Sequence, residues 1–406
     1  MNLGYFISKR ISSGRQYGFS STTHKIASVS IAIGLGAAIV SFLIMKGFQQ
    51  TIKDKIYSFS AHLLITKFTM DNSLEEQPFF YNIDFYKNYR KYPYIDHVQE
   101  YSHKAGLIKA DEEVFGVVFK GVGKSFGLET FKPNLTEGRF IHWPDSGYAN
   151  EVVISRHIAN KINAQVEDNL VVHFFQNPPR FRRLKVVGIY ETNLSEYFDN
   201  KMIVGDIRLI QRLNNWADSV AGGLEILVKD VDKVEEAFMA IGEGMDYDLY
   251  IEKVSDKYIQ VFEWLGLITR QVNILLGVIL IVVCVNMISV VLILVMERTS
   301  MIGTLKALGA GNPLIRSVFV FSGMKLIARG LFFGNLAGLG LCYIQYRYRV
   351  VPLNAHDYYM DFVPVGWDWA AVIMLNLLIF VIVSLVLLLP TALVSRISPI
   401  QAIRFD

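Results

Sequence analysis

Four long apolar stretches restrict this chain more than any other feature of its sequence. They lie at about residues 26–46, 269–296, 314–346 and 369–390. Each approaches or exceeds the ~20 residues with which an α-helix crosses a bilayer. Charged residues concentrate outside them, above all in the long segment 47–268. The sequence therefore predicts an α+β membrane protein with four transmembrane helices and a large α+β domain inserted between helices 1 and 2.

The composition agrees with this class. Hydrophobic residues make up 52% of the 406 residues and charged residues 19%. The formal net charge of +3 is too small to suggest a nucleic-acid-binding protein. Both cysteines, Cys284 and Cys342, lie inside expected membrane helices. The inserted domain therefore has no disulfide and must be held together by its own hydrophobic core.

The charge distribution predicts an orientation. Residues 1–25 contain lysines and arginines but no acidic residue, which places this segment in the cytoplasm by the positive-inside rule. Four crossings return residues 391–406 to the cytoplasm and put the short segment 297–313 there as well. The domain of residues 47–268 and the loop of residues 347–368 then lie on the opposite side. A cleavable signal peptide is the alternative reading of the first stretch, which is longer than the ~7–15 residues typical of one.

Hydrophobic periodicity divides the inserted domain into helices and strands. Residues 49–59 and 255–270 carry one charged and one apolar face and are expected to continue the first two membrane helices as stalks. Asn177-Pro178-Pro179 should form a projecting hairpin tip, because proline cannot donate to a strand ladder. Alternating apolar residues predict strands, and longer periods predict helices. The strands are expected at 114–119, 151–154, 170–174, 184–189 and 224–228, and the helices at 155–162, 207–213 and 231–241.

The segment 297–313 predicts a short amphipathic helix. Ile302, Leu305 and Leu308 recur at every third position, which predicts an apolar stripe flanked by charges, and Gly309 can end the helix. Such a helix can insert into a groove on a partner protein or rest among lipid headgroups. The pattern alone favours neither interpretation.

Two cations stand in the first half of the third apolar stretch. Lys325 and Arg329 are four residues apart, and a charge at the bilayer centre costs ~2.5–3.5 kcal/mol on insertion scales. They can extend to the cytoplasmic headgroups or pair with an acidic residue of a partner subunit. The sequence leaves their role open.

Four motifs resemble a known family. The run ERTSMIGTLKALGA, from Glu297, resembles the coupling helix of the FtsX-like permeases, in the MacB-type mechanotransmission branch of ABC transporters. The run from Gly34, GLGAAIVSFLIMKGFQQTIKDKIYSFSAHLLI, resembles the LolC/LolE lipoprotein-release permeases. In those a Gly-Phe pair follows the first span and a His precedes the first strand, and Gly47, Phe48 and His62 occupy these places. The segment YYMDFVPV and the ending SRISPIQAIRFD are also similar.

The resemblance implies a non-catalytic permease subunit in the bacterial inner membrane, with both termini cytoplasmic and the large domain periplasmic. It implies a dimer of a separate cytoplasmic ATPase, which would bind ATP and Mg, so no cofactor is expected on this chain. A second permease subunit, a periplasmic lipoprotein chaperone, an acylated lipoprotein and membrane lipid are the other implied partners. The sequence does not decide between homo- and heterodimer, or which lipoproteins are handled.

The resemblance also implies three candidate sites. The candidate ATPase-coupling residues are Glu297, Arg298, Ile302, Leu305, Lys306, Leu308 and Gly309. The candidate chaperone-docking hairpin comprises Gln176, Asn177, Pro178, Pro179, Arg180 and Phe181. The candidate lipid-cavity residues, which could equally pack helix against helix, are Leu43, Met45, Phe48, Val261, Phe262, Leu265 and Ile268.

Other kinds of site find little support. Gly123-Lys124-Ser125 resembles the end of a nucleotide-binding P-loop, but Val118 stands where the motif requires glycine. The histidines form no His-Glu-x-x-His motif and have no cysteine partners, so no metal site is expected. No Gly-x-Ser-x-Gly motif indicates a catalytic serine. Two alternative functions remain, an FtsX-like cell-division regulator of murein hydrolases and a MacB-like efflux permease.

Overall fold

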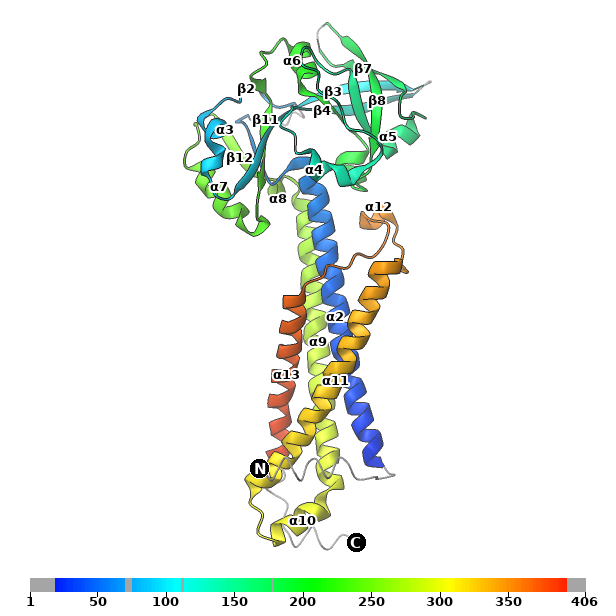
Figure 1. Ribbon diagram of the computed structural model, residues 1–406, viewed down its shortest axis with the longest axis vertical. Coiled ribbons are helices and arrows are strands. Elements are labelled where there is room, and N and C mark those ends of the chain that lie inside the picture. The colour runs from blue at the N-terminus through cyan, green and yellow to red at the C-terminus, as the bar shows by residue number, and fades with distance from the viewer. Residues whose placement is uncertain (1–18, 70–74, 111–112, 177, 393–406) are drawn as a thin grey trace. The chain divides into compact units, whose positions relative to one another are not determined.

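The computed structural model describes residues 19–69, 75–110, 113–176 and 178–392 (Figure 1). The chain divides into two compact units. The helical unit comprises Met1–Gln50, Trp264–Pro352 and Phe362–Asp406, and the sheet unit comprises Thr51–Glu263 and Leu353–Asp361.

Long helices make up the helical unit. Within the described residues, four helices are long and apolar enough to cross a membrane. They are α2 (Phe19–Ser60), α9 (Ile259–Glu297), α11 (Asn312–Tyr348) and α13 (Trp369–Ala392), with the short α10 (Thr299–Ala307) between α9 and α11. The four apolar stretches of the sequence all fall within these long helices.

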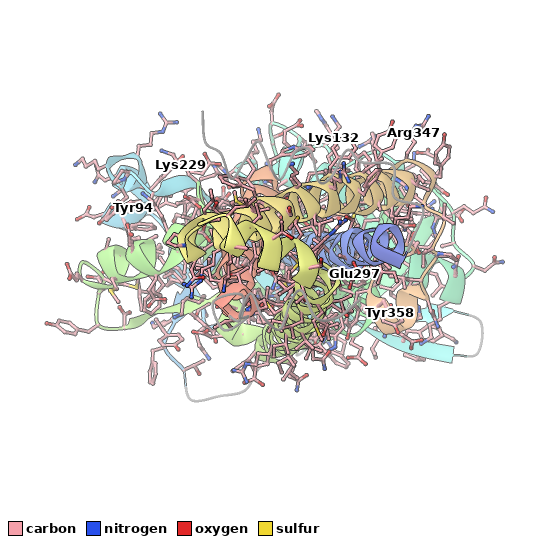
Figure 2. All side chains as sticks on the ribbon, turned by 90° about the horizontal axis from the view of Figure 1, so that it is seen from below. Tyr94, Lys132, Lys229, Glu297, Arg347 and Tyr358 are labelled. Carbon is pink, nitrogen blue, oxygen red and sulfur yellow. The ribbon has the colours of Figure 1, made fainter. Side chains whose placement is uncertain are left out.

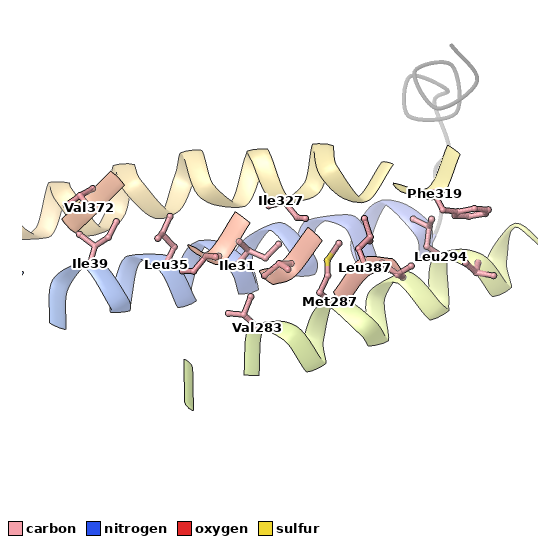
Figure 3. Close-up of a cluster of buried hydrophobic side chains, with 14 of the residues drawn as sticks. Ile31, Leu35, Ile39, Val283, Met287, Leu294, Phe319, Ile327, Val372 and Leu387 are labelled. Atoms are coloured by element: carbon pink, nitrogen blue, oxygen red, sulfur yellow. The ribbon is translucent and has the colours of Figure 1, made fainter. Parts of the chain in front are cut away.

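One apolar core runs along the helical unit (Figure 3). On α2 its members recur at every fourth residue, because side chains at i and i+4 share a helix face. Val283 and Met287 of α9, Ile327 of α11 and Leu387 of α13 pack into the same core. The contributing residues of α2 are Ile31, Leu35, Ile39 and Leu43.

Glycines bring α11 close to α2. A Cβ atom on Gly334 would lie 2.9 Å from the carbonyl oxygen of Ala32, and one on Gly338 would lie 3.0 Å from that of Gly36. The first distance is shorter than real Cβ contacts, and the second is tighter than nearly all of them. Small residues at such positions allow backbones to approach closely, which is a main source of helix association in membranes.

A ten-stranded mixed sheet forms the sheet unit. Its strand order is β12-β1-β11-β3-β4-β9-β6-β8-β5, and β7 pairs with β3 and β8. The pairs β4–β9 and β6–β8 are parallel and the others antiparallel. The strands are β1 (Leu63–Lys67), β3 (Ile95–Ala110), β4 (Glu113–Val122), β5 (Leu135–Gly138), β6 (Glu151–Ser155), β7 (Asn169–Phe174), β8 (Arg180–Tyr190), β9 (Met202–Asp206), β11 (Gly223–Val228) and β12 (Leu249–Lys253).

Short elements complete the sheet unit. Strands β2 (Phe79–Phe80) and β10 (Val220–Ala221) pair as a small second sheet. Two apolar clusters hold the unit together, one around α5 and α6 and the other around α3 and α7. The helices are α3 (Asp84–Asn88), α4 (Leu128–Phe131), α5 (Arg156–Lys161), α6 (Ile207–Asn214), α7 (Val234–Gly242), α8 (Val254–Lys257) and α12 (Ala355–Tyr358).

The strands and helices expected from periodicity are present in the sheet unit. The longest strand, β3, was not expected. Its sequence contains Gln99, Glu100, Ser102 and Lys104, which are buried in the structure. Buried polar residues remove the apolar alternation by which a half-buried strand is recognised.

A buried ion pair joins three strands to the end of α2. Lys120 of β4 is 2% exposed, and its Nζ lies 2.6 Å from Oε1 of Glu225 on β11. The same ammonium donates a hydrogen bond to the carbonyl oxygen of Phe59. Gln99 of β3 donates to the other Glu225 oxygen at 2.7 Å. Burial lowers the pKa of Lys120, and the Glu225 carboxylate opposes that shift.

His62 stabilises the junction between α2 and β1. Its Nδ1 accepts a hydrogen bond from the backbone N–H of Val228 at 3.1 Å, and its own backbone bonds to Ile226 and Val254. Its ring lies 4.3 Å from the ring of Tyr57. Burial lowers the pKa of His62 from 6.5 to about 4, because the charged imidazolium loses its hydration. The imidazole is therefore neutral at physiological pH.

We expect His62 to make the sheet unit sensitive to acid. Its pKa in the folded protein is below that of the unfolded chain, so its contribution is fully present above pH 6.5 and is lost as the pH falls toward 4. The full loss is about 3 kcal/mol. Denaturant unfolding of the detergent-solubilised chain and of His62→Asn measures this at pH 7.5 and pH 4.5. The stability advantage of the wild type should shrink by about that amount at the lower pH. Parallel pH profiles for the two proteins would contradict the role given to His62.

Candidate functional site

A short helix occupies the segment in which the coupling helix was expected. Helix α10 spans Thr299–Ala307, and α11 begins at Asn312 with Pro313 in its first turn. Gly309 has a φ of +88°, a left-handed conformation that glycine adopts without steric cost. The backbone N–H of Gly309 bonds to the carbonyl of Lys306 at 3.0 Å, which satisfies a carbonyl at the end of the helix.

The apolar stripe expected on α10 does not form a single exposed face. Ile302 is fully buried in the core of the helical unit, and Leu305 packs partly against that core. Leu308 is 80% exposed. Ile302 and Leu308 are six residues apart, and over six residues an α-helix falls about 120° short of two full turns. The two side chains therefore point in different directions. The prediction that Ile302 faces a partner is therefore wrong for this structure, in which it holds α10 against its own bundle.

A different set of residues forms the exposed face of α10. Ser300, Thr304, Ala307 and Leu308 are exposed, at spacings that place them on one side of the helix. Glu297 is also exposed (Figure 2), whereas Arg298 and Lys306 are half-buried. The serine, threonine and alanine carry no charge and little apolar surface, so no pattern in the sequence marks them as contact residues.

The predicted hairpin connects β7 to β8. The last pair of the ladder is Phe174 with Arg180. Arg180 donates hydrogen bonds from Nη1 to the carbonyl oxygens of Arg212 and Leu213, at 3.4 and 3.2 Å, which fixes the base of the tip against the end of α6. Asn177 lies outside the described residues, Gln176 is half-buried, and Pro178 and Pro179 are exposed.

The hairpin presents aromatic rings among basic side chains. Phe175 is 56% exposed and Phe181 is 64% exposed. Arg183 and Lys185 on β8 are exposed, and Arg182 is half-buried. Sequence reasoning included Phe181 but missed Phe175, which directly follows the apolar run of β7. A surface of this kind suits a partner that offers apolar pockets and acidic groups.

The candidate lipid-cavity residues divide by burial. Some face the interior of the chain's own units, where they pack against other side chains. The buried ones are Leu43, Met45, Val261 and Leu265. The half-buried ones are Phe48, Phe262 and Ile268. Only these three have surface left for a lipid or an acylated substrate.

Two family models match this chain over most of its length. The MacB-like periplasmic core domain matches residues 26–243, and the FtsX-like permease C-terminal matches residues 273–399. The first model alone covers more than half of the 406 residues. The chain belongs to the FtsX-like permeases with a MacB-like periplasmic core domain. It is thus a multi-pass membrane permease of the ABC transporter type, and membership implies partnership with an ATPase and other permease subunits.

Known relatives of this FtsX-like permease match it from end to end. The lipoprotein-releasing system transmembrane protein LolE of Haemophilus influenzae is 21% identical over 99% of this chain and 99% of its own length. LolC of Neisseria meningitidis serogroup B is 23% identical over 97% of this chain and 96% of its own length. Among solved structures, the periplasmic region of MacB from Actinobacillus actinomycetemcomitans matches 52% of this chain and 97% of its own, with 15% identity and a TM-score of 0.34.

The structure explains why glycine stands at position 47 of this permease. The backbone of residues 364–366 crosses α2 at Gly47, and the N–H of Gly366 bonds to the carbonyl of Leu43 at 2.9 Å. A Cβ on Gly47 would lie 2.6 Å from the carbonyl oxygen of Pro364. Any larger residue would therefore displace the segment that leads into α13.

An acidic side chain fills the space beside the P-loop-like residues Gly123-Lys124-Ser125. A Cβ on Gly123 would lie 1.7 Å from Oε1 of Glu100, and Ser125 donates a hydrogen bond to the same carboxylate at 2.5 Å. A carboxylate in this place repels the phosphates that a P-loop cradles. Within the described residues, no group of three or more His, Cys, Asp or Glu side chains is placed to hold a metal ion.

Proposed function

We propose that this chain is the permease subunit of a mechanotransmission ABC transporter that releases lipoproteins from the outer leaflet of the inner membrane to a periplasmic chaperone. A separate cytoplasmic subunit would hydrolyse the ATP, with Mg bound there. The observation that carries the proposal is the match to LolE and LolC over 96–99% of both chains. The FtsX-like regulator and the MacB-like efflux permease belong to the same superfamily, and the names of these relatives favour lipoprotein release over both.

The physics of lipid anchors makes an energy-driven permease necessary for such a task. Each methylene of an acyl chain in the membrane contributes about 0.8 kcal/mol, so an anchor with two or three chains does not leave spontaneously. Release needs an energy source and an apolar surface that receives the chains. Phe48 and Ile268 of the helical unit are the candidates for that surface, because part of each side chain remains exposed.

The proposed topology places the domain between α2 and α9 in the periplasm. Both termini and α10 would be cytoplasmic, and the loop of residues 347–368 would be periplasmic. This arrangement rests on the basic residues of segment 1–25.

Cysteine labelling should report this topology. In a variant lacking Cys284 and Cys342, we expect Ser146→Cys to react with a membrane-impermeant thiol reagent in intact spheroplasts. Thr304→Cys should react only after permeabilisation. Both native side chains are exposed, so absence of reaction cannot come from burial in this chain. Labelling of Thr304→Cys in intact spheroplasts would overturn the orientation.

The proposed ATPase contact is the exposed face of α10 with Glu297. A helix that presents Leu308 beside small side chains fits a groove on a partner. Ile302 and Leu305 support the helix from the opposite side. In this arrangement the partner moves α10 together with the core to which it is attached.

Leu308→Asp should separate the permease from its ATPase. The new carboxylate would be unpaired in a desolvated groove, at a cost of about 3–5 kcal/mol. We expect normal membrane insertion, because Leu308 contributes little to the core, and loss of the ATPase on co-purification. Met239→Asp is the matched control, since Met239 is 59% exposed on α7 of the sheet unit and should leave the ATPase bound. Wild-type ATPase stoichiometry with Leu308→Asp would place the partner elsewhere.

The proposed chaperone contact is the β7–β8 hairpin with Phe175 and Phe181. Exposed aromatic residues that become buried in an interface commonly cost about 2 kcal/mol or more when truncated. We therefore expect Phe181→Ala to weaken binding of the purified chaperone roughly thirtyfold.

The control for the hairpin is Phe80→Ala. Phe80 is 67% exposed on β2, so its truncation removes a similar ring at another place on the sheet unit. It should leave chaperone affinity unchanged. Equal affinities for Phe181→Ala and the wild type would reduce the hairpin to an ordinary turn.

A further inference from the structure

An apolar groove lies between α11 and the start of α13. Its volume is about 760 Å³, within the range of small-molecule pockets. All its residues belong to the helical unit. They are Phe332, Asn335, Leu336, Leu339, Gly340, Tyr343, Tyr346, Trp367 and Trp369.

Two asparagines fix the helices that form the groove. Nδ2 of Asn335 donates to Oδ1 of Asn376 at 2.7 Å, and Nδ2 of Asn376 donates to Oδ1 of Asn335 at 3.0 Å. Each amide also bonds to a carbonyl of its own helix, Leu331 and Val372 respectively. These amides satisfy each other, so the groove offers apolar and aromatic surface and keeps a defined width.

The groove has an apolar end and an aromatic end. Phe332 and Leu336 form the first, while Tyr346, Trp367 and Trp369 gather at the second, with the two indole rings stacked at 5.7 Å. Tryptophan and tyrosine prefer the level of the lipid headgroups. From Phe332 to Tyr346, α11 rises by about 21 Å, which exceeds half of the ~30 Å hydrocarbon core. The groove therefore spans one leaflet.

A cation stands at the aromatic end. Phe332, Leu336, Gly340 and Tyr343 recur along one face of α11, and Arg347 continues this series four residues after Tyr343. Arg347 is exposed in the last turn of the helix, at the depth that the aromatic rings assign to headgroups. Its guanidinium suits the phosphate of a lipid.

We propose that this groove binds one acyl chain of an anionic glycerophospholipid, with the lipid phosphate at Arg347. The chain would lie along Phe332, Leu336 and Gly340, and the glycerol region among the rings of Tyr346 and Trp369. The site goes beyond lipoprotein release, since it needs neither the ATPase nor a lipoprotein. It assigns a lipid ligand to α11 and α13 rather than to α2 and α9.

Gly340 allows the groove to be filled without disturbing the fold. A Cβ at this position meets no atom within 4 Å, so Gly340→Leu should occupy the space of the acyl chain. Gly277→Leu on α9 is the matched control, because a Cβ there also meets nothing. Arg347→Gln removes the charge while leaving the groove open.

Tryptophan fluorescence can report occupation. The full chain is reconstituted in phosphatidylcholine vesicles with increasing fractions of phosphatidylglycerol brominated on its acyl chains. Bromine quenches Trp367 and Trp369 when a chain lies in the groove, and the other three tryptophans give the same background in every variant. For the wild type and Gly277→Leu, we expect quenching that saturates at a low fraction of brominated lipid.

The variants decide the proposal. Gly340→Leu should lose the saturating component, and Arg347→Gln should need about fivefold more brominated lipid for half-saturation. Quenching proportional to the lipid fraction in the wild type would mean ordinary exchanging lipid and would overturn the site. So would a curve unchanged by Gly340→Leu. No quenching at all would also overturn it, since a second copy of the chain or another helix would then cover the groove.

Discussion

The buried pair of Lys120 and Glu225 determines how the sheet unit is built. A charge in an apolar interior is tolerated only when a partner and further hydrogen bonds compensate for its lost hydration. Lys120 obtains these from Glu225 and from the carbonyl of Phe59, so β4, β11 and the last turn of α2 must meet at one point. Removing either charge would leave the other one uncompensated. The end of α2 is thereby joined to the middle of the sheet.

The same pair shows where sequence reasoning ends. Strands such as β6 and β11 were predictable because apolar side chains cover them and leave a local pattern. Strand β3 was not, because it buries Gln99 and Lys104, whose partners Glu225 and Glu75 come from distant parts of the chain. No local window contains both members of such a pair. The hydrophobic helices, in contrast, were predictable almost in full, since the bilayer sets their length and composition.

The candidate sites divide along the same line. The positions of α10 and of the β7–β8 hairpin follow from local signals, namely Gly309 after one and the prolines within the other. Which face each of these elements exposes does not follow from local signals. Which side of α10 is exposed depends on the packing of Ile302 in a core drawn from four other helices. The groove beside Gly340 likewise depends on how α13 packs against α11, which no motif specifies.

Gly47 and Gly366 meet an obstacle of another kind than Gly323 does. A Cβ on Gly366 would lie 2.7 Å from the backbone nitrogen of Gly47. Neither residue has a side chain that a second mutation could shorten. At Gly323 the obstacle is the side chain of Leu387, 2.4 Å from an added Cβ. A smaller residue at 387 could restore a Gly323 mutant, so suppressor genetics would find second-site revertants there. At the crossing of two backbones no such revertant exists, and only restoration of glycine recovers the fold.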